Sequence, residues 1–230
     1  MKFGVLRFPG SCDEVDAVLA CGRYGEAELL WHHERDLRGA DVVVVPGGFS
    51  YGDYLRAGAI ARFSPVMESV AEFAADGGLV FGICNGFQVL CEARLLPGAL
   101  LPNAELRFIC RQMDVVVENA DTRFTRTCAQ GDRLSIPMKH MSGRYYAPPE
   151  LIESMEANRQ VVLRYAPGGP HNGSLHDIAG VTNEAGNVMG LMPHPEHAVD
   201  PLTGSTDGGK LFESIAQHAA ARAGAAPVPA

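Results

Sequence analysis

Short apolar runs alternate with amphipathic segments along this chain, and the alternation predicts strands interleaved with helices. The runs expected as strands are 2–7, 28–31, 42–45 and 79–83. The segments expected as helices are 13–24, 55–75 with a break at Pro65, and 210–222. The four consecutive valines at 42–45 indicate a strand buried on both faces, which is typical of parallel sheets. We therefore predict an α/β fold with an open, mainly parallel sheet and helices on both faces.

The later part of the chain has a different pattern. From 106 to 117 and again from 161 to 192, short strands are expected between Gly, Pro and Asn turns. The 230 residues contain 47% hydrophobic positions, enough for one full α/β domain, and neither a linker nor an internal repeat divides them. We predict one domain over 1–222 and a disordered Ala- and Pro-rich tail over 223–230.

One segment joins a strand, a sharp turn and a helix around a cysteine. The apolar run 79–83 is followed by Cys84, and a helical apolar pattern begins directly afterwards. Gly82 and Gly86 flank the cysteine, where a sharp turn tolerates little side-chain bulk. This is the pattern of a nucleophile elbow with a thiol in place of the usual hydroxyl. The thiol would lie at a helix N-terminus, which favours the thiolate form.

A base for this nucleophile is expected far downstream. Pro195 disfavours the helical region for His194, and in extended chain residues two apart point the same way. The Glu196 carboxylate should then orient His194, while His197 should point to the other face. A metal site using the two histidines is the poorer interpretation, because no further ligand cluster accompanies them. We predict no metal in this chain.

A glycine pair follows the valine strand, where a free backbone N–H could face a ligand. Acyl transfer needs donors aimed at the developing oxyanion. We assign this role to the N–H of Gly48, or of its neighbour Gly47, together with that of Asn85 after the nucleophile. These glycines do not match the Gly-x-Gly-x-x-Gly spacing, and no Gly-Lys-Ser/Thr follows.

Together these motifs resemble the class I (triad-type) glutamine amidotransferases, which have a flavodoxin-like fold. Within them, the chain is similar to the glutaminase subunits of phosphoribosylformylglycinamidine synthase, over about residues 1–216. The stretches that carry this resemblance are 46–59, 82–88, 107–108, 136–137, 143–145, 172–174, 178–180 and 186–196.

The resemblance implies an activity and a set of roles. Cys84 would attack the side-chain amide of L-glutamine, His194 would move the proton and Glu196 would orient His194. Gln88 matches a residue that contacts the bound substrate, and Gly47, Gly48 and Asn85 match the oxyanion region. The ammonia would pass to a large synthase subunit, with a small accessory subunit also present, for purine (IMP) biosynthesis. That partner would use ATP and Mg, because nothing in this chain resembles a nucleotide site.

Net charge and cysteine usage limit which partners and which cellular compartment are expected. The net charge of −8 and the pI near 5.4 argue against nucleic acid or an anionic membrane as a main partner. The six cysteines are scattered without a Cys-x-x-Cys pair, and no signal peptide or apolar 20-mer is seen. A cytoplasmic protein with reduced thiols fits this pattern best.

The synthase partner should border the site at Tyr51, Asp53, Arg56 and the 138–146 loop. That loop departs from the family pattern at Met141 and Ser142, which puts the partner contact there in doubt. Glu105 stands where a small polar residue is common.

Two other classes of function remain open. A dienelactone-type thiol hydrolase shares the elbow, but its acid would precede the histidine, as Asp177 precedes His194 or Asp200 precedes His218. A non-catalytic module on the same scaffold is the other alternative. It is disfavoured because all three triad positions are filled.

Overall fold

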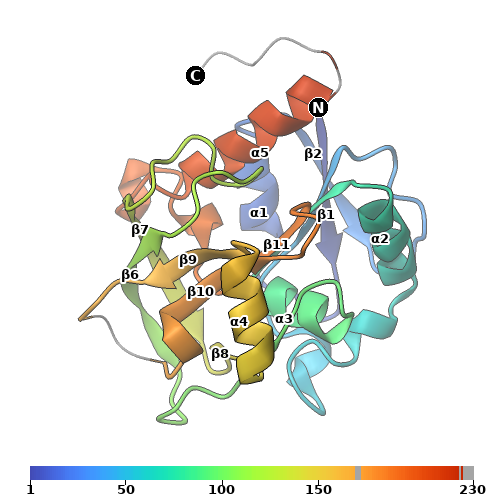
Figure 1. Ribbon diagram of the computed structural model, residues 1–230. Coiled ribbons are helices and arrows are strands. Elements are labelled where there is room, and N and C mark those ends of the chain that lie inside the picture. The colour runs from blue at the N-terminus through green and yellow to red at the C-terminus, as the bar shows by residue number, and fades with distance from the viewer. Residues whose placement is uncertain (169–171, 223, 225–230) are drawn as a thin grey trace.

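Nine strands form one sheet in the order β2-β1-β3-β4-β11-β10-β9-β6-β7 (Figure 1). Their bounds are β1 Lys2–Arg7, β2 Glu26–Trp31, β3 Val42–Val45, β4 Leu79–Ile83, β6 Ile109–Val117, β7 Arg133–His140, β9 Val161–Tyr165, β10 Ile178–Thr182 and β11 Val188–Leu191. A separate pair joins β5, Ala99–Leu101, to β8, Arg144–Tyr146. The helices are α1 Glu14–Cys21, α2 Pro65–Ala75, α3 Asn85–Glu92, α4 Pro149–Ala157 and α5 Gly209–Arg222. This computed structural model describes residues 1–168, 172–222 and 224.

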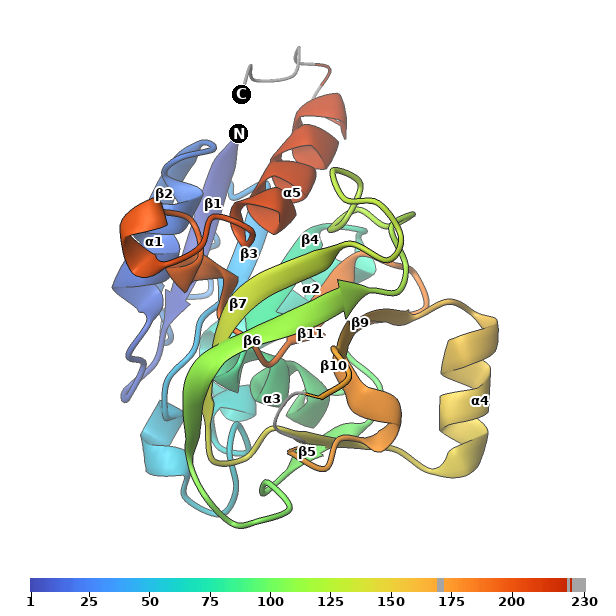
Figure 2. The same cartoon turned by 90° about the vertical axis from the view of Figure 1, so that its left-hand side faces the viewer.

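The sheet has a parallel half and an antiparallel half. The strands β2, β1, β3, β4 and β11 pair in parallel, which agrees with the fully buried valine strand β3. From β11 onward every pairing is antiparallel, through β10, β9, β6 and β7. The long β6 and β7 ladder crosses the front of the molecule in Figure 2. The predicted open α/β sheet is confirmed, with the antiparallel strands as an extension of its parallel half.

Helices cover both faces of the parallel half, as predicted. On one face, Phe81 of β4 packs edge-on against Phe212 of α5, with ring centroids 5.8 Å apart. On the other, the next residue, Gly82, faces Leu90 of α3. Neighbouring residues of a strand point to opposite faces, so β4 is buried between two helical layers. Its whole length is therefore apolar and inaccessible to water.

Several local predictions were wrong. Residues 55–60 are not helical, because Leu55 and Gly58 have φ values of 71° and 80°; only a short 3-10 turn at Ala61–Phe63 precedes α2. The expected 138–146 loop is instead the end of β7, a turn, and β8. The elements β5, β7, β8 and α4 were not foreseen.

Two further predictions concern membrane-spanning segments and the C-terminal tail. Within the described residues, no helix has the length and apolar character needed to cross a membrane. Of the expected tail, residues 223 and 225–230 lie outside the described part of the chain.

Candidate active site

Cys84 lies at the turn between β4 and α3, where the backbone adopts φ 50° and ψ −104°. A non-glycine residue in this region is strained by about 1–3 kcal/mol and is held there by its surroundings. The Cys84 N–H donates to Leu191 O of β11 at 2.8 Å, and the side chain is only 5% exposed. The predicted elbow is therefore present, with the thiol at the N-terminus of α3.

The flanking glycines are required by close packing. A Cβ on Gly86 would overlap Val45 O at the end of β3, and one on Gly82 would lie 2.5 Å from Leu90 Cδ1. Both glycines therefore allow α3 to approach the sheet closely enough to hold the turn. This agrees with the interpretation made from the sequence.

The histidine–glutamate pair forms as predicted, but by a different backbone route. The His194 Nδ1 lies 2.6 Å from Glu196 Oε1, and both side chains are buried. The segment Pro195–His197 is a 3-10 turn rather than extended chain. This turn also brings His197 to the same cluster, 3.6 Å from Glu196 Oε1, so its expected position on the other face was wrong.

The sheet register places this pair beside the nucleophile. Strands β4 and β11 are parallel neighbours, with Ile83 opposite Leu191, so the residues that follow both strands emerge at the same edge. The His194 N–H donates to Pro137 O of β7 at 2.7 Å, which fixes the backbone at this point.

The electrostatics of His194 suit a proton carrier. Burial alone would lower its pKa, but the negative charges of Glu196 and of ionised Cys84 outweigh it and raise the pKa to about 10. Its buried Nε2 has no hydrogen-bond partner among the described residues. With Nδ1 on Glu196, Nε2 is the nitrogen left to exchange a proton with the thiol or the substrate.

Three further ionisable side chains adjoin this pair: Asp13 and Lys139, which the sequence did not single out, and His197, which it placed on the other face. Asp13, after β1, forms a short ion pair with Lys139 of β7, and its Oδ2 lies 3.7 Å from His194 Nδ1. The His197 Nε2 lies 3.3 Å from Asp13 Oδ1. Burial works against the Asp13 charge, but His197, His194 and Lys139 together hold the pKa of this carboxyl well below its usual range. Its place at the carboxyl end of a parallel strand was the available signal.

The four side chains Asp13, His194, Glu196 and His197 also lie close enough to share a metal ion. The donor set fits such an ion poorly, because Lys139 already pairs with Asp13 and Nδ1 of His194 is taken by Glu196. The arrangement favours holding a proton on His194 instead.

The residues assigned to oxyanion and substrate binding come together around the elbow. Gly48, with φ 141°, lies against the 10–12 segment, and Gly47 lies against Asp13 and His194. The Asn85 side chain accepts from Ser50 N at 3.1 Å and donates to Gln88 Oε1 at 2.8 Å. The Gln88 Nε2 in turn donates to Ser142 O, so Gln88 ties α3 to the turn after β7.

A cavity of about 70 Å³ opens onto the nucleophile. It is lined by Cys12, Asp13, Gly48, Phe49, Asp53, Cys84, Gln88, Phe108, Lys139, His140, Met141 and Ser142. His140 was not foreseen: it is 3% exposed, and both ring nitrogens lack a hydrogen-bond partner among the described residues. Burial lowers its pKa to about 3, so the ring is neutral.

The packing of Gly47 yields a testable prediction. A Cβ on Gly47 would lie 2.7 Å from His194 Cε1 and would overlap Asp13 Oδ2. Gly47→Ala should displace the imidazole and lower kcat by on the order of 100-fold, as expected for a misplaced catalytic group. Steady-state kinetics with Gly22→Ala as the control would check this, because Gly22 is exposed and its φ of −60° suits alanine. A Gly47→Ala enzyme with normal kcat would show that His194 is not held in this position.

A thiol at a strained elbow, beside a buried histidine–glutamate pair on an α/β sheet, defines a triad-type thiol enzyme for acyl transfer. Comparison with known proteins agrees. Residues 1–215 match the family model of the CobB/CobQ-like glutamine amidotransferase domain. The chain belongs to this family and, within it, to the PurQ subunits of phosphoribosylformylglycinamidine synthase.

The relatives that support this assignment cover nearly the whole chain. The PurQ subunit of Salinibacter ruber is 54% identical over 226 residues, 94% of this chain and 96% of the relative. That of Thermus thermophilus is 54% identical over 227 residues, 96% of this chain and all of the relative. A solved structure described as PurLQS from Thermotoga maritima superposes with a TM-score of 0.85 at 44% identity, covering 93% of this chain and 96% of that chain.

Proposed function

We propose that this chain hydrolyses L-glutamine to glutamate and ammonia as the glutaminase subunit of phosphoribosylformylglycinamidine synthase. The observation that carries the proposal is Cys84 at its strained elbow beside the buried His194–Glu196 pair, in a chain of the PurQ family. The product ammonia would be transferred to the synthase to form the amidine.

The first half-reaction forms a thioester. The Cys84 Sγ attacks the carboxamide carbon of glutamine, and the carbonyl oxygen becomes an oxyanion. The backbone N–H of Asn85, with that of Gly48 or Gly47, would donate to this oxygen. The C–N bond then breaks, and His194 gives its Nε2 proton to the departing nitrogen, which leaves as ammonia. Glu196 holds the imidazole by its Nδ1 throughout.

The second half-reaction releases glutamate. His194 takes a proton from water, the resulting hydroxide attacks the thioester carbon, and the same donors bind the second oxyanion. The C–S bond breaks, and the thiolate and imidazolium are restored. Within the cavity, Gln88 and His140 would contact the substrate, since both line it beside Cys84.

The synthetic step would be performed by a partner. The related chain from Thermotoga maritima was solved as part of PurLQS, and we extend that assembly to this chain as a complex with a large synthase subunit and a small accessory subunit. ATP and Mg would be used by the large subunit. The chain would act in the cytoplasm, which agrees with six free cysteines.

Transfer of labelled nitrogen tests this proposal. The chain, mixed with the synthase subunits, ATP and Mg, should release glutamate from [amide-15N]glutamine and place the label in the amidine product. Label found only as free ammonium would contradict channelling. No glutamate release would contradict the glutaminase assignment itself.

The partner is expected to border the cavity at Tyr51, Asp53, Arg56 and the segment 138–146. Asp53 supports this, because burial without a charged partner raises its pKa to about 6, and Phe49 and Phe108 nearby are 45% and 50% exposed. The double variant Asp53→Lys/Arg56→Glu should fail to co-elute with the synthase in size-exclusion chromatography. The control Asp36→Lys/Arg35→Glu changes similar charges on the segment after β2. Normal co-elution of the first variant would show that the interface does not include Asp53 and Arg56.

The alternative of a dienelactone-type hydrolase is wrong. Of the two acids it could use, Asp200 pairs with Arg23 at 2.7 Å rather than with His218. The place beside His194 that Asp177 would need is taken by Glu196, at 2.6 Å. Family membership points the same way.

A further inference from the structure

A second, larger hollow lies away from the nucleophile. It has a volume of about 400 Å³, within the range of small-molecule sites, and is formed by the loop after β6, the turn before β9, the β10–β11 turn and α5. The β10–β11 turn precedes the amino end of β11, whereas His194 follows its carboxyl end. The pocket is therefore at the opposite edge of the sheet from the active site.

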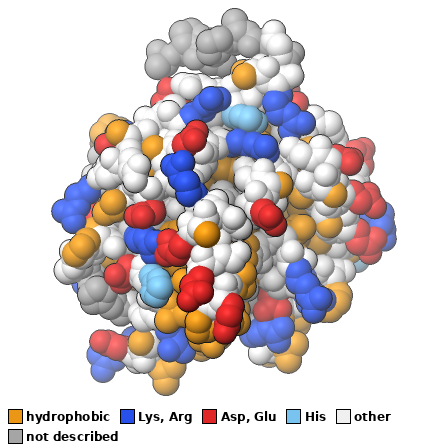
Figure 3. Space-filling view, viewed as in Figure 1, with side chains coloured by type: hydrophobic (Ala, Val, Ile, Leu, Met, Phe, Trp, Pro, Cys, Tyr) orange, Lys and Arg blue, Asp and Glu red, His pale blue; other side chains and the backbone are white. Residues whose placement is uncertain are grey.

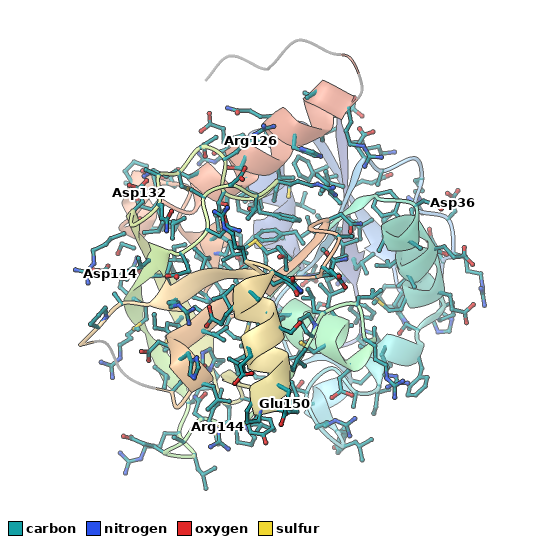
Figure 4. All side chains as sticks on the ribbon, in the orientation of Figure 1. Asp36, Asp114, Arg126, Asp132, Arg144 and Glu150 are labelled. Atoms are coloured by element: carbon teal, nitrogen blue, oxygen red, sulfur yellow. The ribbon has the colours of Figure 1, made fainter. Side chains whose placement is uncertain are left out.

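This pocket gathers positive charge on an acidic protein. Arg123, Arg126 and Arg159 line it together with His218 of α5, while the whole chain has a net charge of −8. Figure 3 shows basic side chains around one histidine in the upper part of this face, and Figure 4 places Arg126, a residue of the loop after β6, beside α5. Two acidic residues, Asp121 and Glu184, also line the pocket; Asp121 is 3.9 Å from Arg159.

Two of the guanidinium groups have no partner among the described residues. Among the described residues, Arg123 and Arg126 form no hydrogen bond and no ion pair, in contrast to Arg159, which donates to Asn119 Oδ1 at 2.8 Å. Burial lowers the pKa of His218, and the positive charges of Arg123, Arg126 and Arg222 lower it further. Guanidiniums in such positions recognise phosphate by paired, charge-assisted hydrogen bonds.

The rest of the wall is polar and well ordered by its own hydrogen bonds. The Asn119 Nδ2 donates to Arg159 O at 2.8 Å, and the Gln160 Nε2 donates to Thr182 O at 3.0 Å. The Asn183 Oδ1 accepts from the N–H groups of the β10–β11 turn. Amides and hydroxyls suit hydroxyl-bearing ligands, and the described residues of the wall include no Phe, Tyr or Trp on which a base could stack.

From these observations we infer that the pocket is a binding site for a small phosphate ester that carries hydroxyl groups, of the pentose phosphate class. The phosphate would lie on Arg123 and Arg126. The hydroxyls would face the Asn158 amide and the Glu184 carboxylate, because the side-chain amides of Asn119 and Asn183 are already hydrogen-bonded within the wall. The site is separate from glutamine hydrolysis, and the inference does not depend on the proposed function.

Calorimetric titration of the full chain with ribose 5-phosphate, inorganic phosphate and ribose tests the inference. Ribose 5-phosphate should bind more tightly than either fragment. The double variant Arg123→Gln/Arg126→Gln should weaken its binding by about tenfold or more, since charge-assisted hydrogen bonds are lost. The matched control is Arg111→Gln/Arg133→Gln, which neutralises two arginines of a pocket of about 420 Å³ beside β6 and β7 and should leave binding unchanged.

Several results would overturn the inference. They are no binding of ribose 5-phosphate to the wild type, equal binding of inorganic phosphate alone, or equal weakening by both double variants. Loss of co-elution with the synthase subunits in the Arg123→Gln/Arg126→Gln variant, without sugar phosphate binding by the wild type, would identify a protein contact instead. Glutamate release and melting temperature of the double variant should match those of the wild type.

Discussion

Cys84→Ser should abolish glutamine hydrolysis. The hydroxyl is a far weaker nucleophile than the thiol at neutral pH, and His194 interacts with Cys84 as well as with Glu196. We expect a loss of on the order of 10⁴-fold or more in kcat for glutamate release, with little change in stability because the two side chains are similar in size. Glutamate release by the complex, wild type and variant side by side, is the measurement.

The matched control is Cys110→Ser, which changes an exposed thiol on β6. It should retain full activity. If Cys84→Ser kept glutaminase activity, the thioester mechanism would be wrong, and another nucleophile would have to be sought.

Glu196→Gln should lower kcat by on the order of 10³-fold. The amide is nearly isosteric, but it cannot accept from His194 Nδ1–H with a full negative charge, so the imidazole loses both its orientation and the stabilisation of its protonated form. The carboxylate raises the pKa of His194, so its removal should lower that pKa and move the alkaline limit of kcat/KM to lower pH. A pH profile of kcat/KM distinguishes this electrostatic effect from simple loss of packing.

Asp200→Asn is the control for Glu196→Gln, because Asp200 is one of the two acids that the rejected hydrolase mechanism could use. It pairs with Arg23 at the surface, so its replacement should leave both kcat and the pH profile unchanged. A loss of activity in Asp200→Asn together with a normal Glu196→Gln enzyme would reverse our assignment.

Elements with a strong local signal could be predicted from the sequence. The strand Lys2–Arg7 and the valine strand have the predicted bounds, and α5 begins one residue earlier than expected. The strand β7 was missed although its alternate residues Leu134, Ile136 and Met138 are buried, a readable two-residue period. Pro137 obscured that pattern; it is tolerated because β7 is the edge strand of the sheet.

The segment after β3 could not be predicted in the same way. Tyr51, Asp53 and Leu55 all adopt positive φ, which residue types other than glycine rarely do and which therefore leaves no mark in the sequence. Tertiary contacts impose this conformation, for example the Tyr51 hydroxyl, which lies 2.8 Å from His32 Nδ1 and 3.0 Å from Ser64 Oγ.

Cys84, His194 and Glu196 could be recognised as candidates because each occupies a motif whose chemistry can be read from the sequence. The surrounding charges could not, since Asp13 and Lys139 are far apart in the chain and meet only through the sheet. His197 illustrates the limit of local reasoning: one turn of 3-10 geometry in place of extended backbone reversed the side on which it lies.

Because β4 pairs with β11, two segments that are synthesised far apart in the chain must meet before the site is formed. The nucleophile is synthesised with α3, but its base follows β11, near the end of the domain. Closing the large loop between these strands is a slow, long-range step in folding. A nascent chain therefore contains Cys84 well before the histidine that would activate it has been made. We expect the thiol to become reactive only when β11 has paired with β4, so unfinished chains should not hydrolyse glutamine.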